Sequence, residues 1–211
     1  MPESGRARPL VIGFDLDLTL INTVPGFAAT LEALGAELGV PFPVAEMSVN
    51  IGPPLDQILG GHLAAEAVAP ATDRFRELYA EHAIAATPVL PGAHEALAAV
   101  RGLGGTIVLV TGKFGPNADR HVAHLGLDVD VVHGLVWGAG KGAVLRELGA
   151  SAYVGDHVHD VEGARAAGIT SVSVLTGPST RAELEGAGTD VVLDDLGAFP
   201  AWLAGHVASL A

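Results

Sequence analysis

The sequence predicts an α/β protein in which a parallel sheet lies between two layers of helices. From residue 106 onward, short apolar segments alternate with segments of helical spacing, a pattern typical of parallel sheets wound with helices on both faces. A further apolar segment at residues 11–20 follows a polar N-terminal stretch and indicates another buried strand. Connection rules for such elements favour a Rossmann-like three-layer sandwich.

The segment 11–20 contains a strand that ends at Asp15 and Asp17. Side chains two positions apart in an extended chain point the same way, so both carboxylates are expected at one spot. Two like charges held this close require a proton or a cation between them. A divalent metal ion is the simplest expectation.

The residues after Leu20 change to helical spacing and exceed what a crossover needs. One predicted helix has an apolar stripe before a break at residues 41–43, formed by Phe27, Leu31, Leu34 and Leu38. A second is expected at about 54–65, and a third with a buried face formed by Phe75, Leu78, Tyr79 and His82. A crossover between parallel strands needs only about a dozen residues. We therefore expect a helical subdomain at 22–88, inserted into a core domain of residues 1–21 and 89–211.

The remaining elements of the core domain follow one another in short steps. Strands are predicted at 106–111, 129–133, 152–154, 171–175 and 190–193. Helices are predicted after Pro91-Gly92 with Leu97 and Val100, at 116–124, at about 141–148, between the strand at 152–154 and Ala167, and at the C-terminus.

Composition excludes several classes of function. Twenty-four acidic residues against eleven basic ones give a formal charge of −13, which opposes nucleic acid and anionic membranes as partners. The chain has no cysteine, so disulfides and zinc-thiolate sites are absent. No apolar run is long enough to span a bilayer, and we expect a cytoplasmic protein. The sequence gives no indication of oligomeric state.

Chemically useful side chains follow the predicted strands. The first strand ends at Asp15 and Asp17, the second at Thr111, and the fourth at Asp156 with Asp160 close behind; Lys141 begins a helix after a glycine-rich segment. Ligands of open α/β sheets bind beyond the carboxyl ends of the strands. Carboxylates, a hydroxyl and an ammonium at one rim favour metal-assisted phosphoryl transfer.

Each of these residues alone has a simpler explanation. Asp17 and Asp160 suit turns or helix N-termini, and Lys141 suits an exposed helix start. Only their ordered combination indicates a site. Lys113 is expected to be a rim or solvent lysine rather than a catalytic one, and no motif assigns the remaining polar candidates. His157 and His159 adjoin the aspartates of the metal motif and are expected to be loop residues or to lie behind the ligands, not to bind the metal themselves. His121 and His124 are expected on an exposed or half-buried helix face. The unassigned candidates for substrate contact are Asn22, Asn50, His62, Arg74 and Arg76.

These motifs together resemble the haloacid dehalogenase superfamily, and within it the phosphoglycolate phosphatase-like members with a helical cap after the first strand. The matching residues are Asp-Leu-Asp-Leu-Thr at 15–19, Thr111, Lys141 and Gly-Asp-His-Val-His-Asp at 155–160. The segment 163–169 is also similar to the family. Leu18 departs from the usual glycine and Gly142 from the proline that commonly follows the lysine; neither departure removes a catalytic group.

The resemblance implies roles for four residues. Asp15 is the nucleophile that becomes an aspartyl phosphate, and Asp17 is the general acid and base. Thr111 donates a hydrogen bond to the phosphoryl group, and Lys141 balances charge on it and on Asp15.

The resemblance also implies a Mg²⁺ cofactor. Its ligands are the Asp15 carboxylate, the Asp17 backbone carbonyl and Asp156, with Asp160 as a ligand or directly behind them. A hard cation with oxygen ligands suits a chain without cysteine.

The implied function is a magnesium-dependent phosphatase acting on a small phosphate monoester of the phosphoglycolate or sugar phosphate class. The expected partner is accordingly a small phosphorylated metabolite, over which the helical cap closes. Two alternatives stay open: a phosphotransferase of the β-phosphoglucomutase type, and a phosphoacceptor or binding module without turnover. A dehalogenase lacks the acid that Asp17 supplies, and a phosphonate-cleaving relative needs a cap lysine, which residues 22–88 do not contain.

Overall fold

The computed structural model describes residues 9–49 and 51–210, with the side chains of the last two left out. These residues form a sheet with the strand order β3-β2-β1-β4-β5-β6, and all five pairings are parallel. The strands are β1 (Val11–Phe14), β2 (Thr106–Val110), β3 (Val131–His133), β4 (Ala152–Gly155), β5 (Thr170–Val174) and β6 (Val191–Leu193). The predicted α/β class is confirmed.

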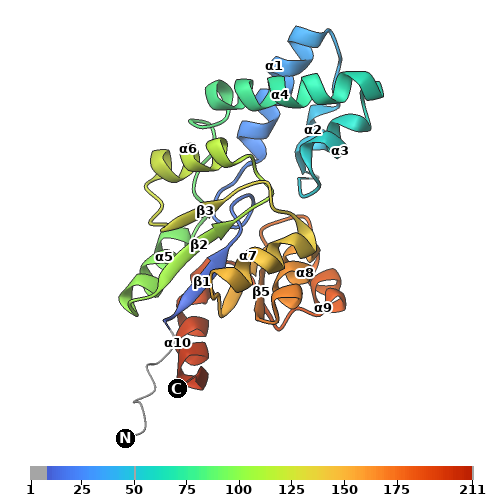
Figure 1. Cartoon of the computed structure of the whole chain (residues 1–211). Coiled ribbons are helices and arrows are strands. Elements are labelled where there is room, and N and C mark those ends of the chain that lie inside the picture. Colours follow the sequence, from blue (N-terminus) through green and yellow to red (C-terminus); the bar gives the residue numbers. More distant parts are fainter. Residues whose placement is uncertain (1–8, 50, 211) are drawn as a thin grey trace, which may run out of the picture.

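Helices cover both faces of this sheet (Figure 1). Ile12 and Phe14 of β1 pack on one face with α5 (Ala93–Gly102), α6 (Gly115–Leu125) and α10 (Phe199–Leu210). Val11 packs on the opposite face with α7 (Lys141–Glu147) and α8 (Val158–Ala167), and α9 (Arg181–Ala187) lies beside α8. Neighbouring strand residues thus serve different cores, as the alternation of side chains along a strand requires.

The helices between β1 and α5 form a separate layer at the carboxyl end of the sheet (Figure 1). They are α1 (Val24–Leu38), α2 (Val44–Val49), α3 (Leu55–Gly60) and α4 (Ala65–His82), and we call them the helical insertion. They enclose their own apolar cluster, which includes Leu31, Leu34 and Phe75. The two connecting segments lie side by side, because the Asn22 N–H donates to the Pro88 carbonyl at 2.8 Å. The division into domains at 22–88 stays a prediction.

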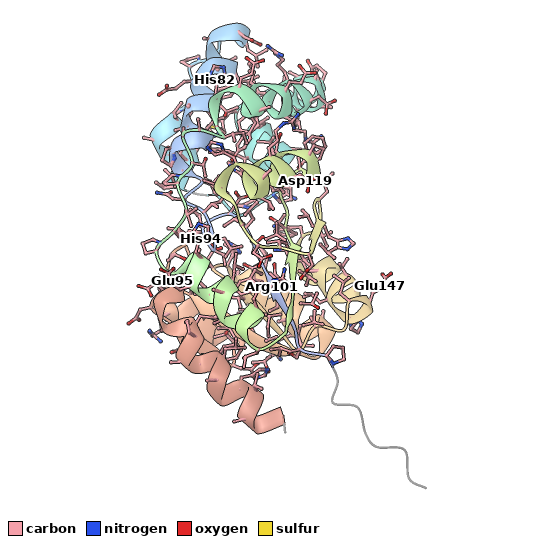
Figure 2. All side chains as sticks on the ribbon, turned by 90° about the vertical axis from the view of Figure 1, so that its left-hand side faces the viewer. His82, His94, Glu95, Arg101, Asp119 and Glu147 are labelled. Atoms are coloured by element: carbon pink, nitrogen blue, oxygen red, sulfur yellow. The ribbon has the colours of Figure 1, made fainter. Side chains whose placement is uncertain are left out.

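Some sequence expectations for the insertion are wrong in detail. The helix α2 was not predicted, and α3 ends at Gly60 rather than near 65. His82, expected on the buried face of α4, is exposed (Figure 2), because Ala83 fills the next core position and is fully buried. Leu38 is 44% exposed; it is the last residue of α1, which ends at the left-handed Gly39.

Within the described part of the chain, no helix combines the length and the apolar character needed to cross a membrane.

Gly92 provides a test of the packing that closes one face of the sheet. Its φ is 81°, and a Cβ there would press on the backbone of Leu196 and Gly197. Gly104 has a similar φ of 69° but open space around it. Gly104→Ala should lower the free energy of unfolding by about 1–2 kcal/mol, the cost of a left-handed alanine. Gly92→Ala should cost about 1–3 kcal/mol more through overpacking.

Urea unfolding of the wild type and both variants measures these costs. Equal destabilisation by the two substitutions would contradict the close approach of the 196–197 turn to the start of α5.

Candidate active site

The six residues singled out in the sequence all line one cavity between the sheet and the helical insertion. Asp15 follows β1, Thr111 follows β2 and Asp156 follows β4, while β1 lies between the other two strands. Lys141 is the first residue of α7, and Asp160 lies in the first turn of α8. The cavity has a volume of about 440 Å³. Residues far apart in sequence therefore meet at the carboxyl ends of the central strands.

Lys141 is a buried ammonium held by two carboxylates. Its Nζ lies 2.7 Å from Asp160 Oδ1 and 3.4 Å from Asp15 Oδ2. Nζ also donates to the Tyr153 hydroxyl at 2.9 Å, and that hydroxyl donates to the Val110 carbonyl. Burial lowers the pKa of Lys141, but Asp15 and Asp160 outweigh it and the net shift is upward. The ammonium is charged and fixed in position.

Three carboxylates form a compact acid cluster. One oxygen each from Asp15, Asp156 and Asp160 lie within 4.8 Å of one another. Asp156 accepts the Thr19 hydroxyl at 2.8 Å, and Asp160 accepts the His157 N–H at 3.1 Å. The cluster is thus held by neighbours on several segments.

Glycine makes room for this cluster. A Cβ at Gly155 would collide with the Asp160 side chain, and one at Gly177 with the Asp156 carboxylate. Any larger residue at either position would displace an acid.

The acid cluster carries more negative charge than the described side chains around it balance. Burial raises the pKa of Asp15 to about 6. Lys141 lowers this pKa, whereas the negative charges of Asp160 and Asp17 raise it further. Burial, followed by Asp160 and Asp15, raises the pKa of Asp156 well above its ordinary value. Asp15 Oδ1 is buried and has no hydrogen-bond partner among the described residues. Excess charge, oxygen donors and an unpaired oxygen fit a hard divalent cation such as Mg²⁺.

Asp17 faces a different cation from the acid cluster. Its Oδ1 lies 2.7 Å from Lys113 Nζ and accepts the Thr23 hydroxyl. Burial alone would raise the pKa of Asp17, but Lys113 and Thr23 hold it below its ordinary value. The two aspartates were expected to share one cation, but each has its own ammonium partner: Asp17 faces Lys113 and Asp15 faces Lys141. Lys113 was expected to be a rim or solvent lysine, and the solvent alternative is wrong, since its side chain is 8% exposed and lines the cavity.

Lys113 also contacts the helical insertion. Its Nζ lies 4.4 Å from the centre of the Tyr79 ring, close enough for a cation–π interaction. The Tyr79 hydroxyl lies 3.1 Å from His121 Nε2. His121 is fully buried, contrary to expectation, because Tyr79 of α4 lies edge-on against it; His124 on the same helix is exposed.

The loop before α3, residues 51–54, contacts a group of stacked rings from the core, formed by Trp137, His157 and His159. Trp137 Nε1 donates to the Gly52 carbonyl at 2.8 Å. The Trp137 and His159 rings lie 3.9 Å apart, and the His157 and His159 rings 4.6 Å apart. His157 caps α8 by accepting the His159 N–H, and neither histidine belongs to the acid cluster. Sequence reasoning missed Trp137, since an isolated aromatic residue carries no motif.

Of the substrate-contact candidates in the insertion, Arg76 lines the cavity. Arg74 is paired with Glu37 and Glu77 instead. Asn22 and His62 do not line the cavity, and Asn50 lies outside the described residues.

The two departures noted in the sequence have structural reasons. Leu18 adopts φ 57°, the left-handed conformation that costs an L-residue about 1–2 kcal/mol. Its N–H donates to the Ile21 carbonyl at 2.9 Å, and its side chain joins the apolar cluster of the insertion. A Cβ at Gly142 would lie 2.7 Å from Ala166 Cβ, so glycine here lets α7 pack closely on α8.

Comparison with known proteins finds similarity over most of the chain. The Haloacid dehalogenase-like hydrolase family matches residues 12–174. Probable phosphatase IndB of Dickeya dadantii is 31% identical over 89% of this chain and 90% of its own. Tyrosine-protein kinase PtkA of Mycobacterium tuberculosis is 30% identical, with 89% of this chain and 69% of the relative covered. A phosphoglycolate phosphatase of Pseudomonas syringae pv. tomato is also 30% identical, with coverages of 89% and 77%.

Solved structures share the fold. A haloacid dehalogenase-like family hydrolase, SP0104 from Streptococcus pneumoniae, superposes with a TM-score of 0.81 at 22% identity. The superposition covers 94% of this chain and 98% of that one.

His121 gives a pH-dependence that can be measured without substrate. Burial, with Lys113 next, lowers its pKa to about 4, whereas an unfolded histidine titrates near pH 6.5. Between these values the unfolded chain binds a proton that the folded chain does not, so stability falls as the pH drops. His121 should therefore remove about 3 kcal/mol between pH 7 and pH 4, at about 1.4 kcal/mol per pH unit.

The measurement compares urea unfolding of wild type, His121→Gln and His124→Gln across this pH range. His121→Gln should flatten the acid side of the stability profile, and the exposed-site control should follow wild type. Identical profiles for all three proteins would show that His121 titrates normally in the folded chain.

Proposed function

The chain belongs to the haloacid dehalogenase-like hydrolase family and is a phosphatase of that family; we propose that it is Mg²⁺-dependent and acts through an aspartyl phosphate on Asp15. The observation that supports this most is the meeting of Asp15, Thr111 and Lys141 at one end of the cavity, 3.4 Å separating Lys141 Nζ from Asp15 Oδ2. A carboxylate beside a fixed ammonium and a hydroxyl donor is suited to attack on a phosphoryl group.

In the first step, a carboxylate oxygen of Asp15 attacks phosphorus, and the bond from phosphorus to the substrate oxygen breaks. The departing alkoxide takes a proton from Asp17, and Asp15 carries the phosphoryl group. In the second step, water attacks this phosphorus and gives its proton to Asp17. Inorganic phosphate leaves and the Asp15 carboxylate is restored.

Asp17 is ionised in this structure because Lys113 lies 2.7 Å from it and its pKa is lowered. That form is ready to accept a proton from water in the second step. To act as an acid in the first step, Asp17 must first bind a proton. A dianionic phosphate group nearby favours this, because it raises the pKa of Asp17 and competes for Lys113.

Lys141 and Thr111 stabilise the charge that develops on the phosphoryl oxygens. Lys141 is already fixed by Asp160 and Tyr153, so it need not reorganise during the reaction. Thr111 is buried at the end of β2, and its hydroxyl can donate to a phosphoryl oxygen.

Mg²⁺ would be held by Asp15 and Asp156, with the backbone carbonyl of Asp17 and with Asp160 as a ligand or directly behind. When bound it neutralises carboxylate and phosphoryl charge. The raised pKa of Asp15, about 6, is the reason such a cation is needed, because a protonated carboxyl is a poor nucleophile.

The helical insertion would serve as the cap that keeps bulk water from the reacting groups. It contributes Phe27, Phe75 and Tyr79 to the wall of the cavity that holds the catalytic residues. Substrate selection would accordingly depend on these side chains.

A second candidate is transfer of the phosphoryl group to an acceptor other than water. The relative named as a tyrosine-protein kinase favours this candidate, and a phosphomutase would share the same first step. Hydrolysis and mutase activity are separated by supplying a sugar 1-phosphate and measuring both its isomer and free phosphate. Isomer without phosphate would indicate the mutase.

Replacing the proposed nucleophile gives the most direct test. Asp15→Asn should abolish phosphate release from phosphate monoesters in Mg²⁺. Asp17→Asn should reduce it by about 10²–10⁴-fold, the usual contribution of a general acid or base. The matched control is Asp119→Asn, an exposed residue of α6 that does not line the cavity (Figure 2).

Phosphate release is measured for all four proteins with Mg²⁺ and with chelator. Turnover by Asp15→Asn at the wild-type rate would exclude the aspartyl-phosphate mechanism.

The metal proposal can be tested without turnover. Asp156→Asn retains an oxygen for Thr19 and removes a carboxylate whose pKa is raised by burial and its neighbours. The pKa of Asp156 is raised on folding, so its ionisation costs stability at neutral pH. Without metal, the variant should therefore melt at a higher temperature than wild type.

Mg²⁺ at about 100 times its Kd should stabilise wild type by about 2.7 kcal/mol and stabilise Asp156→Asn much less. Thermal melts with Mg²⁺ and with chelator check both statements, again with Asp119→Asn as the control. A full Mg²⁺-dependent shift in Asp156→Asn would remove that residue from the ligand set.

A further inference from the structure

We propose that the alcohol part of the substrate is an apolar ring carrying a single hydrogen-bonding group, so that the substrate is an aryl-alkyl phosphate rather than phosphoglycolate or a plain sugar phosphate. This inference rests on the proposed phosphatase function and names the substrate class of the same cavity.

The cavity has two chemically different ends. The phosphoryl end contains Thr111, Lys141 and the carboxylates of Asp15, Asp17, Asp156 and Asp160. The wall beyond them is more apolar than polar, with Asp56, Asp73 and Arg76 as its charged members. Five Phe, Tyr or Trp residues line that wall: Phe27, Phe75, Tyr79, Phe114 and Trp137. Three come from α1 and α4 and two from loops of the core, so aromatic rings approach the ligand space from both sides. A volume of about 440 Å³ accommodates a ring-sized group beside the phosphate.

Two leucines that line this cavity have a left-handed backbone conformation. Among the described residues, Leu18 and Leu135 alone combine a non-glycine side chain with positive φ, at 57° and 58°. Both line the cavity. Glycine or asparagine would adopt this conformation more readily. Leu18 packs in the apolar cluster of the insertion, whereas Leu135 is 58% exposed, so Leu135 is the one that presents apolar surface to the cavity.

The charges in the cavity disfavour a second anionic group on the substrate. Among the lining lysines and arginines that the structure describes, each has a carboxylate partner. Lys113 pairs with Asp17 at 2.7 Å, Lys141 with Asp160 at 2.7 Å, and Arg76 with Asp73 at 3.1 Å. The glycolate carboxylate would therefore have to break an existing ion pair.

The polar side chains of the wall are mostly engaged. Tyr79 is bound to His121, and Asn117 bridges the Arg76 carbonyl and Arg120. Among the buried polar side chains of the wall, Thr72 differs, because its hydroxyl has no hydrogen-bond partner among the described residues. It can serve one polar group of a ligand, and the exposed Asp56 carboxylate also lines the cavity. A sugar would present several hydroxyls and leave most of them without a buried partner.

Binding of unreactive phosphonates tests this class independently of turnover. The probes are 3-phenylpropylphosphonate, propylphosphonate and 3-phosphonopropionate, isosteres of 2-phenylethyl phosphate, ethyl phosphate and phosphoglycolate. With Mg²⁺ present, calorimetry should give the phenyl compound at least about tenfold tighter binding than either of the others, because burying a ring is favourable. Equal affinities, or tightest binding of 3-phosphonopropionate, would overturn the inference.

A matched pair of variants localises the preference. Leu135 and Leu103 are both exposed, at 58% and 50%, but only Leu135 lines the cavity. Leu135→Asn suits the left-handed backbone and should reduce the phenyl-over-propyl preference about threefold or more. Leu103→Asn should leave it unchanged. A preference that survives Leu135→Asn intact would count against the proposed position of the ring.

Phosphate release from the three corresponding esters separates this inference from the proposed function. All three esters are phosphates of primary alcohols. Differences in kcat/KM between them therefore report chiefly on recognition of the alcohol part. A phenyl preference in binding without any release would contradict the phosphatase mechanism while supporting the ligand class. Equal release of all three together with equal phosphonate affinities would leave the mechanism standing and overturn the ligand class.

Discussion

The structure of the site depends on the crowding of carboxylates at the carboxyl ends of β1 and β4. Asp15, Asp156 and Asp160 lie within 4.8 Å of one another, and burial raises the pKa of the first two. Such an arrangement persists only where cations compensate it. Lys141 supplies part of that compensation, and the remaining charge supports the divalent metal that we propose. The bare glycines at 155 and 177 serve the same arrangement by leaving room for the acids.

Asp17 is kept electrostatically apart from this cluster, although it lies two residues from Asp15. Lys113 balances its charge, and Tyr79 of the helical insertion packs on Lys113. The proposed acid and base is therefore ionised by a partner that the insertion also contacts. This division gives the two aspartates different protonation properties, as consecutive nucleophilic and proton-transfer steps require.

The two ends of the cavity come from different parts of the fold. The end that we propose as catalytic is built largely from strand termini of the parallel sheet. The apolar wall comes from the helical insertion and from loops, including two leucines in left-handed conformation. Family membership accordingly defines the reaction more closely than the substrate, because recognition of the alcohol depends on side chains outside the motifs.

The sequence by itself determined the α/β class, the approximate strands and six residues that line one cavity, because periodicity and strand-end position are local properties. It also indicated surplus chain after β1, but it misplaced His82 and Leu38, since burial at a helix end depends on the partner. Only the tertiary structure decided that Lys113 is buried against Asp17, 96 positions away, and that Thr19 supports Asp156, 137 positions away. Likewise, His121 is buried only because Tyr79 of a distant helix covers it. Charge pairing and burial depend on which distant segments come into contact in the folded chain, and a local pattern of residues does not indicate those contacts.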